Sequence, residues 1–333
     1  QIIKLLAGRS EVHYRIGFET EFDLQVLSWL NVLRRQARNG VAAPHTFKLL
    51  DTLVHEMRLF KSPAEIAMMR YAAQTAARAH TKAMQTCRSG LFEFEVQAEI
   101  EREFRKDGME PSYTSIVGGG ENACILHYVE NRSELKSGDL LLIDAGSEHQ
   151  GYASDITRSF PVSGRFTKEQ AQLYQVVLDA QKAAIAVVKP GNNWDAPHQA
   201  AVRSLTAGLV NLGLLQGEVD ELIKDPPKPA DGTAPQEAPY RQFYMHKTGH
   251  WLGLDVHDVG DYKVNGEWRT LEPGMVLTVE PGLYVSPADN VDPKWWSIGI
   301  RIEDDVLVTA EGCEVLTAGV VKEIADIEAL MVQ

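Results

Sequence analysis

The segment "IGIRIEDDVLVT" combines the alternation of a half-buried strand with charges that such a strand rarely carries. Its isoleucines recur at every second position, and successive strand side chains point to opposite faces. The face opposite the isoleucines therefore carries Arg301 and Glu303. Taken alone, this face is most simply explained as a solvated outer surface. The alternative is a functional site beside the strand, and other segments of the chain favour that alternative.

Carboxylates also stand at the ends of other apolar segments. "LLLIDAG" reaches Asp144, "GMVLTVEPG" reaches Glu280, and Asp155 lies on the returning strand "YASDITRSF". Asp144 and Asp155 could face each other across a hairpin. Two ionised carboxylates so placed repel, and one would be forced neutral unless a cation bridged them. The simpler interpretation is a turn acid with a solvated acid, and a strand-end acid at Glu280.

Three histidines lie close together in "MHKTGHWLGLDVHDVG", namely His246, His250 and His257. A single histidine here would most simply be a hydrogen-bonded core residue. Three within twelve residues, among glycines and apolar residues, indicate a site. Gly249 and Gly253 would allow the backbone to approach a ligand or another strand closely.

Together these segments supply four carboxylates and one imidazole. The five residues are Asp144, Asp155, His250, Glu280 and Glu303. Oxygen ligands favour Mn²⁺ or Mg²⁺, with Zn²⁺ or Co²⁺ as further candidates. Four carboxylates are too many for one catalytic ion but suit two ions about 3.5–4 Å apart, which can hold a hydroxide and polarise a carbonyl. On this hypothesis Glu303 is a metal ligand, and Arg301 points towards the substrate.

The remaining pattern predicts an α+β fold with an antiparallel sheet flanked by helices, because helices and strands come in runs rather than in strict alternation. Ser62, Pro63 and Glu65 mark the start of a long helix, and Thr167 with Gln170 marks another. Further helices are predicted over about 92–106 and 195–212. Strands are predicted in "YTSIV", "DLLLIDAG", "YASDITRSFPV", "MVLTVEPGLYV" and "IGIRIEDDVLVT".

Two regions stand outside this pattern. Residues 1–57 contain one predicted strand and one predicted helix, too little to bury a core of their own. Residues 225–239, with five prolines, are predicted to form an exposed loop. The chain begins without methionine, so we expect a fragment or a processed form.

Composition limits the possible partners. The net charge of -13 argues against a nucleic-acid-binding protein, which would show a basic face. No apolar run approaches the roughly 18 residues that a membrane helix needs. The three cysteines are scattered, which suits a reducing compartment, and we therefore expect a cytoplasmic protein.

From about Lys61 to its end, the sequence resembles the aminopeptidase P (Xaa-Pro aminopeptidase) members of peptidase family M24, which have the pita-bread fold. The resemblance rests on "IDAG" with "SDITRSFPV", "GHWLGLDVHDVG", "VLTVEPGLY" and "GIRIEDDVLVT", in that order and approximate spacing. It implies that residues 1–57 are the last part of an N-terminal domain. Residues 58–333 would then be the pita-bread metallopeptidase domain.

The resemblance also implies roles for individual residues. Two divalent ions, usually Mn²⁺, would be bound by the five residues named above, and Glu280 would also take the nucleophile's proton. Three histidines would contact the substrate, and an arginine would lie beside the leaving group. These are His127 in "CILHY", His246, His257 and Arg301.

The expected function is release of the N-terminal residue from peptides with proline in second position, by attack of a metal-bridging hydroxide. A prolidase acting on Xaa-Pro dipeptides is the nearest alternative, and a peptide-binding module with weak catalysis is the alternative from another class. Proline-containing peptides are the expected partners, with no nucleic acid and no membrane. A homo-oligomer, dimer or tetramer, is the expected assembly.

Overall fold

The computed structural model describes residues 1–226 and 237–332, and these divide into two compact units, Gln1–Arg58 and Leu59–Gln333. The division falls one residue after the predicted boundary. Most of the proline-rich stretch predicted as a loop lies outside the described residues. Among the described residues, no helix combines the length and apolar character needed to cross a membrane.

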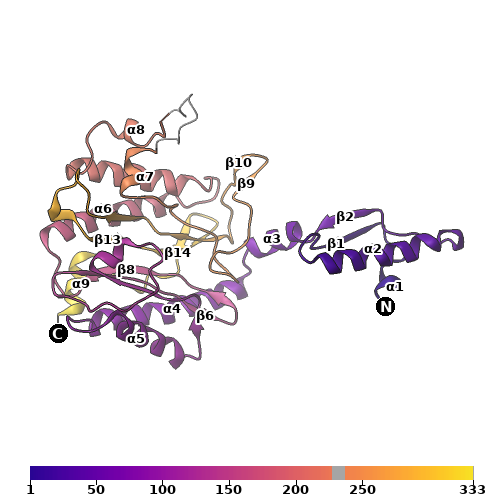
Figure 1. Cartoon of the computed structure of the whole chain (residues 1–333), viewed down its shortest axis with the longest axis horizontal. Helices are drawn as coiled ribbons and strands as arrows, with labels where there is room; N and C mark the ends of the chain where they lie inside the picture. Colours follow the sequence, from indigo (N-terminus) through magenta and orange to yellow (C-terminus); the bar gives the residue numbers. More distant parts are fainter. Residues whose placement is uncertain (227–236, 333) are drawn as a thin grey trace. The chain divides into compact units, whose positions relative to one another are not determined.

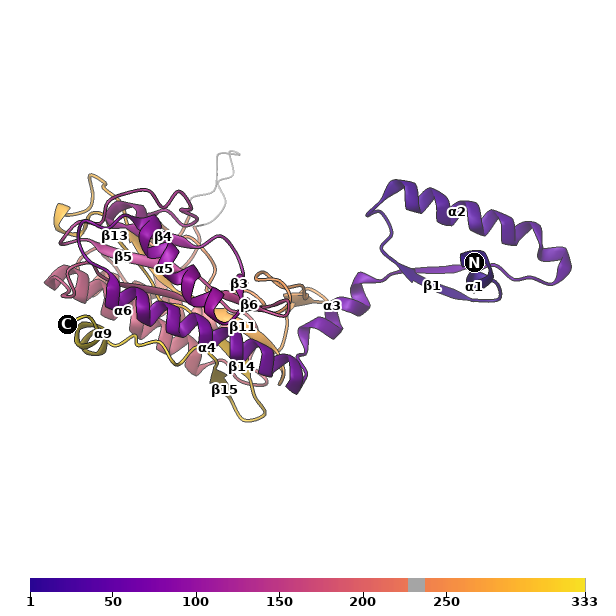
Figure 2. The ribbon, with the colours of Figure 1, turned by 90° about the horizontal axis from the view of Figure 1, so that it is seen from below.

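The first unit contains more regular structure than the predicted strand and helix. It is built from α1 (Ile2–Leu6), β1 (Glu11–Tyr14), α2 (Thr20–Arg35), β2 (Thr46–Leu49) and α3 (Asp51–Leu59). β1 and β2 pair in parallel, with α2 alongside β1 (Figure 2). The ring of Tyr14 on β1 contacts that of Phe22 on α2 at 6.0 Å between centroids. Assignment of this unit to the end of a larger N-terminal domain stays a prediction.

The helices of the second unit begin where the capping signals predict. α4 (Pro63–Thr86) starts with a capping box, in which Ser62 Oγ accepts from the Glu65 amide and Glu65 Oε2 accepts from the Ser62 amide. The same reciprocal pair, Thr167 with Gln170, opens α6 (Lys168–Ala186). The other helices of this unit are α5 (Glu93–Lys106), α7 (Ala196–Asn211), α8 (Val219–Leu222) and α9 (Ile324–Met331).

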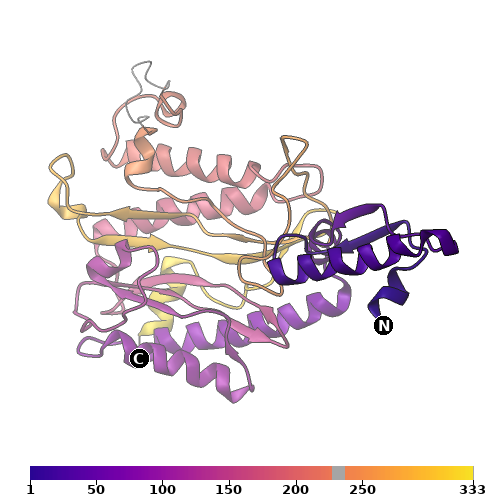
Figure 3. The ribbon, with the colours of Figure 1, turned by 45° about the vertical axis from the view of Figure 1, so that its right-hand side comes forward.

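Antiparallel strands lie between two helix pairs, α4 with α5 and α6 with α7 (Figures 1 and 3). The α+β prediction is therefore confirmed. Three sheets build the centre: β4-β5-β8, β11-β14-β15 and β12-β13. Their strands are β4 (Ile116–Gly119), β5 (Leu140–Asp144), β8 (Thr157–Pro161), β11 (Val276–Val279), β12 (Gly282–Val285), β13 (Ile298–Arg301), β14 (Asp304–Val308) and β15 (Cys313–Val315). Smaller sheets join β3 (Glu110–Pro111), β6 (Ser147–His149) and β7 (Tyr152–Ala153), and β9 (Lys263–Val264) with β10 (Glu267–Trp268).

Two predicted strands are interrupted, and this corrects the sequence reading. β11 ends before Glu280, β12 starts after Pro281, and the partner segment breaks at Ile302 and Glu303. The ladder accordingly passes from β11 with β14 to β12 with β13. Proline has no N–H to donate to a ladder, which accounts for a break at this place. Glu303 therefore lies at a break between strands and not within one continuous strand.

Two other strand predictions need smaller corrections. Of "YTSIV", only the last two residues belong to β4, so Tyr113 lies outside it. The segment "YASDITRSFPV" divides into β7 and β8, and Asp155 occupies the connection between them. Both corrections concern residues that approach the centre of the molecule from irregular backbone.

The charged face of "IGIRIEDDVLVT" is buried as fully as its isoleucines. Arg301 is 4% exposed and Glu303 1%, and Asp304, which alternation places on the face of the isoleucines, is 0% exposed. Asp304 points away from the cavity described below and accepts hydrogen bonds from Arg158 at 2.7 Å and from Lys322 at 2.6 Å. Burial favours the neutral acid, but these two cations hold the pKa of Asp304 at about 2. The interpretation of this face as a solvated surface is therefore wrong.

His80 on α4 gives a testable link between burial and stability. Its ring is fully buried, with Nε2 at 2.9 Å from the carbonyl oxygen of Ala145, and burial lowers its pKa from 6.5 to about 4. Between these two values the unfolded chain binds a proton that the folded chain excludes. The free energy of unfolding should therefore fall as the pH drops from 6.5 to 4, by about 3 kcal/mol in total from this residue.

His80→Gln should reduce this pH dependence, because glutamine can donate to the same carbonyl but does not titrate. The measurement is denaturant unfolding of both proteins at pH 7, 5.5 and 4.5. Parallel pH profiles for the wild type and the variant would contradict the assignment.

Candidate metal centre

All nine residues predicted for the site line one cavity of about 620 Å³ in the second unit. Asp155, Arg301 and Glu303 are buried, whereas His127 and His257 are exposed. The nine are His127, Asp144, Asp155, His246, His250, His257, Glu280, Arg301 and Glu303. The structure thus brings together segments that are up to 176 positions apart, the separation of residues 127 and 303. The role of each residue stays a prediction.

Asp144 and Asp155 approach each other as the hairpin hypothesis expects. Asp144 is the last residue of β5, which pairs with β8, and Asp155 precedes β8. The hydroxyl of Tyr113 lies within hydrogen-bonding distance of both carboxylates, at 2.5 Å from Asp144 Oδ1. Asp155 is 4% exposed, so the interpretation as a turn acid with a solvated acid fails.

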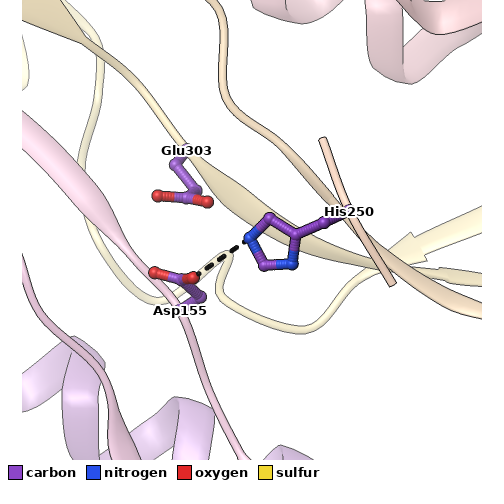
Figure 4. Close-up of side chains that lie close together, drawn as sticks. All are labelled: Asp155, His250 and Glu303. Atoms are coloured by element: carbon purple, nitrogen blue, oxygen red, sulfur yellow. Dashed lines mark ion pairs between the residues drawn. The ribbon is translucent and has the colours of Figure 1, made fainter. Parts of the chain in front are cut away.

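Asp155, His250 and Glu303 form the tightest group of potential ligands. One ligand atom of each lies within 4.8 Å of the others, and the three side chains point towards one another (Figure 4). His250 Nε2 is 3.5 Å from Asp155 Oδ2 and 3.7 Å from Glu280 Oε1. Its other ring nitrogen, Nδ1, lies 3.0 Å from the Trp251 carbonyl oxygen. A proton on Nδ1 would leave Nε2 free to coordinate a cation.

The strand breaks bring the two glutamates to this group. At the breaks the backbone bonds to other ligand-bearing segments: the Glu280 amide donates to the Thr248 carbonyl at 2.8 Å, and the Glu303 amide donates to Thr157 at 3.0 Å. Thr157 Oγ1 also donates to Glu303 Oε2 at 2.6 Å. Each strand break is therefore hydrogen-bonded to backbone next to another predicted ligand: Glu280 to the segment of His250, and Glu303 to the segment of Asp155.

The carboxylates are buried with little compensating positive charge. Burial, together with the charges of Asp155 and Asp144, raises the pKa of Glu280 to about 7 against the lowering effect of His250 and Arg301. Burial and the same two aspartates raise the pKa of Glu303 well above its usual range.

The same excess of negative charge stabilises the protonated form of His250. Burial lowers its pKa, but the hydrogen bond to Asp155 and the charge of Glu280 outweigh burial and raise the pKa to about 9. The site therefore attracts cationic charge. Oxygen ligands with one imidazole fit divalent ions such as Mn²⁺, Mg²⁺ and Zn²⁺.

Arg301 supplies part of the charge balance. It is buried against Asp144, with the guanidinium 2.6 Å from Oδ2, and donates to the hydroxyl of Tyr284 at 2.9 Å. Its Nε lies 3.2 Å from Thr157 Oγ1. These contacts fix the guanidinium at the wall of the cavity.

The three histidines outside the ligand group differ in their surroundings. His246 Nε2 lies 2.9 Å from the Tyr284 hydroxyl and its Nδ1 lies 2.8 Å from the Lys247 carbonyl oxygen, so the ring is held through both nitrogens. The ring of His257 lies 4.1 Å from that of His250 between centroids, on an exposed loop. His127 is exposed at the rim of the cavity. His127 and His257 can present a ring nitrogen to a bound peptide, whereas His246 can do so only by giving up one of its two contacts.

Sequence reasoning missed four side chains that hold the site. Tyr113, Thr157, Thr278 and Tyr284 each contact a predicted site residue. The alternation of "SDITRSF" could have indicated Thr157, because Thr157 and Asp155 are two positions apart. No pattern marks Tyr113, which reaches the carboxylates from outside any strand.

Gly249 confirms the prediction of close backbone approach beside His250. A Cβ atom there would lie 2.0 Å from the Thr278 carbonyl oxygen, far below any tolerable contact. Gly249→Ala must therefore push apart the segments that carry His250 and Glu280. We expect a lower melting temperature and a loss of bound metal. Gly312→Ala is the matched control, because nothing lies within 4 Å of a Cβ at Gly312. Unchanged metal content in Gly249→Ala would contradict the expected displacement.

Comparison with known proteins agrees with this geometry. The sequence profile of metallopeptidase family M24 matches residues 67–310. The chain is 49% identical over its whole length to the Xaa-Pro aminopeptidase of Escherichia coli, of which it spans 73%. It is 52% identical over 280 residues, 84% of the chain, to the Xaa-Pro aminopeptidase of Haemophilus influenzae, of which it spans 62%. The solved structure of Pseudomonas aeruginosa aminopeptidase PepP matches with a TM-score of 0.90 and 55% identity, over 99% of this chain and 72% of that one.

Proposed function

Because the chain belongs to metallopeptidase family M24, we propose that it is a metal-dependent exopeptidase that releases the N-terminal residue from peptides with proline in second position. One observation carries this proposal: four carboxylates, four histidines and an arginine, predicted from separate segments, line one cavity. The relatives named above are Xaa-Pro aminopeptidases, which supports the same specificity.

The metal-binding part of the proposal involves five side chains. Asp144, Asp155, His250, Glu280 and Glu303 would hold two divalent ions, and Mn²⁺ is the ion that we propose. When bound, such ions activate water and polarise a carbonyl group. The donor set supports this assignment, because its carboxylates are buried and repel one another.

The chain's own residues would perform the remaining steps. Glu280 would accept the proton of the attacking water and deliver it to the leaving prolyl nitrogen. His257 would donate to the oxygen that gains charge at the scissile carbonyl. His127 and His246 would hold the peptide around proline, and Arg301 would lie beside the leaving group.

The decisive experiment compares three substrates on protein loaded with Mn²⁺: an Xaa-Pro-Xaa tripeptide, an Xaa-Pro dipeptide and an Xaa-Ala-Xaa tripeptide. We expect release of the first residue from the Xaa-Pro-Xaa tripeptide, loss of activity with a chelator, and recovery when the ion is returned. Cleavage of the dipeptide alone would make the protein a prolidase. Binding of the tripeptide without cleavage would make it a peptide-binding module and overturn the proposal.

We also propose a homo-oligomer, dimer or tetramer, located in the cytoplasm. The three scattered cysteines, Cys87, Cys124 and Cys313, support a reducing compartment. Light scattering after size exclusion would measure the assembly directly.

A further inference from the structure

The loop that carries His257 has little regular structure to hold it in place. Trp251 forms an isolated bridge with Leu277, and the residues from 252 to 260 belong to no helix or strand. The side chains of Leu254, Asp255 and His257 are exposed. The position of His257 must therefore depend on anchors elsewhere in the loop.

Asp258, directly after His257, is such an anchor. It is 5% exposed, and its backbone amide donates to the Trp251 carbonyl at 2.9 Å. Both carboxylate oxygens are used: Oδ1 accepts from the Val259 amide at 3.0 Å, and Oδ2 accepts from Lys61 Nζ at 3.1 Å. The side chains of Lys61 and Asp258 are each only 1% exposed.

Lys61 is itself fixed to the rigid part of the unit. Its amide donates to the Gly274 carbonyl at 2.8 Å, and the next residue, Ser62, caps α4. Gly253 leaves the room that the pair needs, because a Cβ there would lie 2.1 Å from Asp258 Oδ2 and 2.9 Å from Lys61 Cε. The ion pair thus joins the start of α4 to the loop across 197 positions of sequence.

Stability alone is a poor explanation for this pair, because desolvation of both charges offsets much of their attraction. We propose that Lys61 and Asp258 are positioning residues that hold the His257 ring over His250 and the ligand group. This inference rests on the proposed function for its kinetic consequence. The position of the ring, however, can be measured without any reaction.

Asp258→Asn is the first test, because asparagine keeps the shape of the side chain but offers one oxygen in place of two. The side-chain NH₂ group of asparagine must then face either the Val259 backbone amide or the Lys61 ammonium group. In both cases two hydrogen-bond donors oppose each other. Lys61→Met removes the other partner and keeps the length of the side chain. Lys182→Met is the control, since Lys182 forms an ion pair with Glu323 in which both side chains are 47% exposed.

The first readout is nuclear magnetic resonance of the histidine rings in protein labelled at histidine nitrogen. The His257 signals are identified by their absence in His257→Ala. We expect both anchor variants to move the His257 signals and to leave the His80 signals in place, with no change in Lys182→Met. Unmoved His257 signals in Asp258→Asn and Lys61→Met would overturn the proposal, even if the protein cleaves no peptide.

The second readout is turnover of the Xaa-Pro-Xaa tripeptide at measured metal content. A displacement of about 1 Å can cost on the order of 10²-fold, so each anchor variant should lose between ~10-fold and ~10²-fold in kcat while retaining its metal. In a His257→Ala background, Lys61→Met should cause no further loss, because it acts through the missing ring. A further tenfold loss in that background would show that the pair acts elsewhere and would overturn the proposal. If Lys61→Met does not fold, Asp258→Asn in the same background gives the same comparison.

Discussion

Glu303→Ala is expected to remove at least one of two bound metal ions and to abolish peptide hydrolysis. The side chain is 1% exposed, belongs to the tightest group of potential ligands and accepts a hydrogen bond from Thr157 at 2.6 Å. Without its charge, two cations close together would have less negative charge between them, so one should leave. Turnover should fall by at least about 10³-fold, since metal assistance contributes several kcal/mol to the barrier.

The measurement pairs elemental analysis with release of the first residue from an Xaa-Pro-Xaa tripeptide. Glu311→Ala is the control, because Glu311 is exposed and lies outside the cavity. A surface carboxylate should change stability by no more than about 0.5 kcal/mol and leave activity unchanged. If Glu303→Ala retained two ions per chain and wild-type hydrolysis, Glu303 would not be a metal ligand.

His257→Ala should leave the metal content intact and lower turnover by about 10²–10³-fold. Loss of one donor to the charge that develops in the transition state typically costs this much. His257 lies against His250, 4.1 Å between ring centroids, but is not one of the five proposed ligands. The two neighbouring histidines should therefore give different results on substitution.

His250→Ala is the informative comparison, because it should lose metal together with activity. His45→Ala, at an exposed position of the first unit, should change neither. Elemental analysis and tripeptide turnover on all three variants separate the roles. Loss of metal from His257→Ala, or near-normal turnover, would each contradict the assigned role.

The five ligand candidates could be predicted from the sequence because each interrupts an apolar segment, whereas His127 is indicated only by the family resemblance. A charge such as Asp144 at the end of "LLLIDAG" conflicts with burial unless other groups compensate it, so the conflict is visible locally. Capping residues are equally local, and α4 and α6 begin where Ser62 and Thr167 predict.

The rest depends on contacts between distant residues. The break at Glu303 lies opposite the break at Glu280 and Pro281 in the partner segment, so no alternation within the segment itself reveals it. Tyr113 reaches Asp144 across 31 positions from irregular backbone. β2 was not predicted from the sequence and forms by pairing in parallel with β1. The paired residues Glu11 and Thr46 are 35 positions apart.

The paired breaks at Glu280 and Glu303 interrupt one long ladder without changing its register, because Val279 pairs with Asp304 on one side of them and Gly282 with Arg301 on the other. In a continuous ladder, a slip of one residue turns every side chain beyond it to the opposite face. The common register places Glu280 and Glu303 at opposed positions of the same hairpin. An insertion of one residue beside either break would shift one glutamate past the other. This stretch of the chain can therefore change in length only if both strands change together.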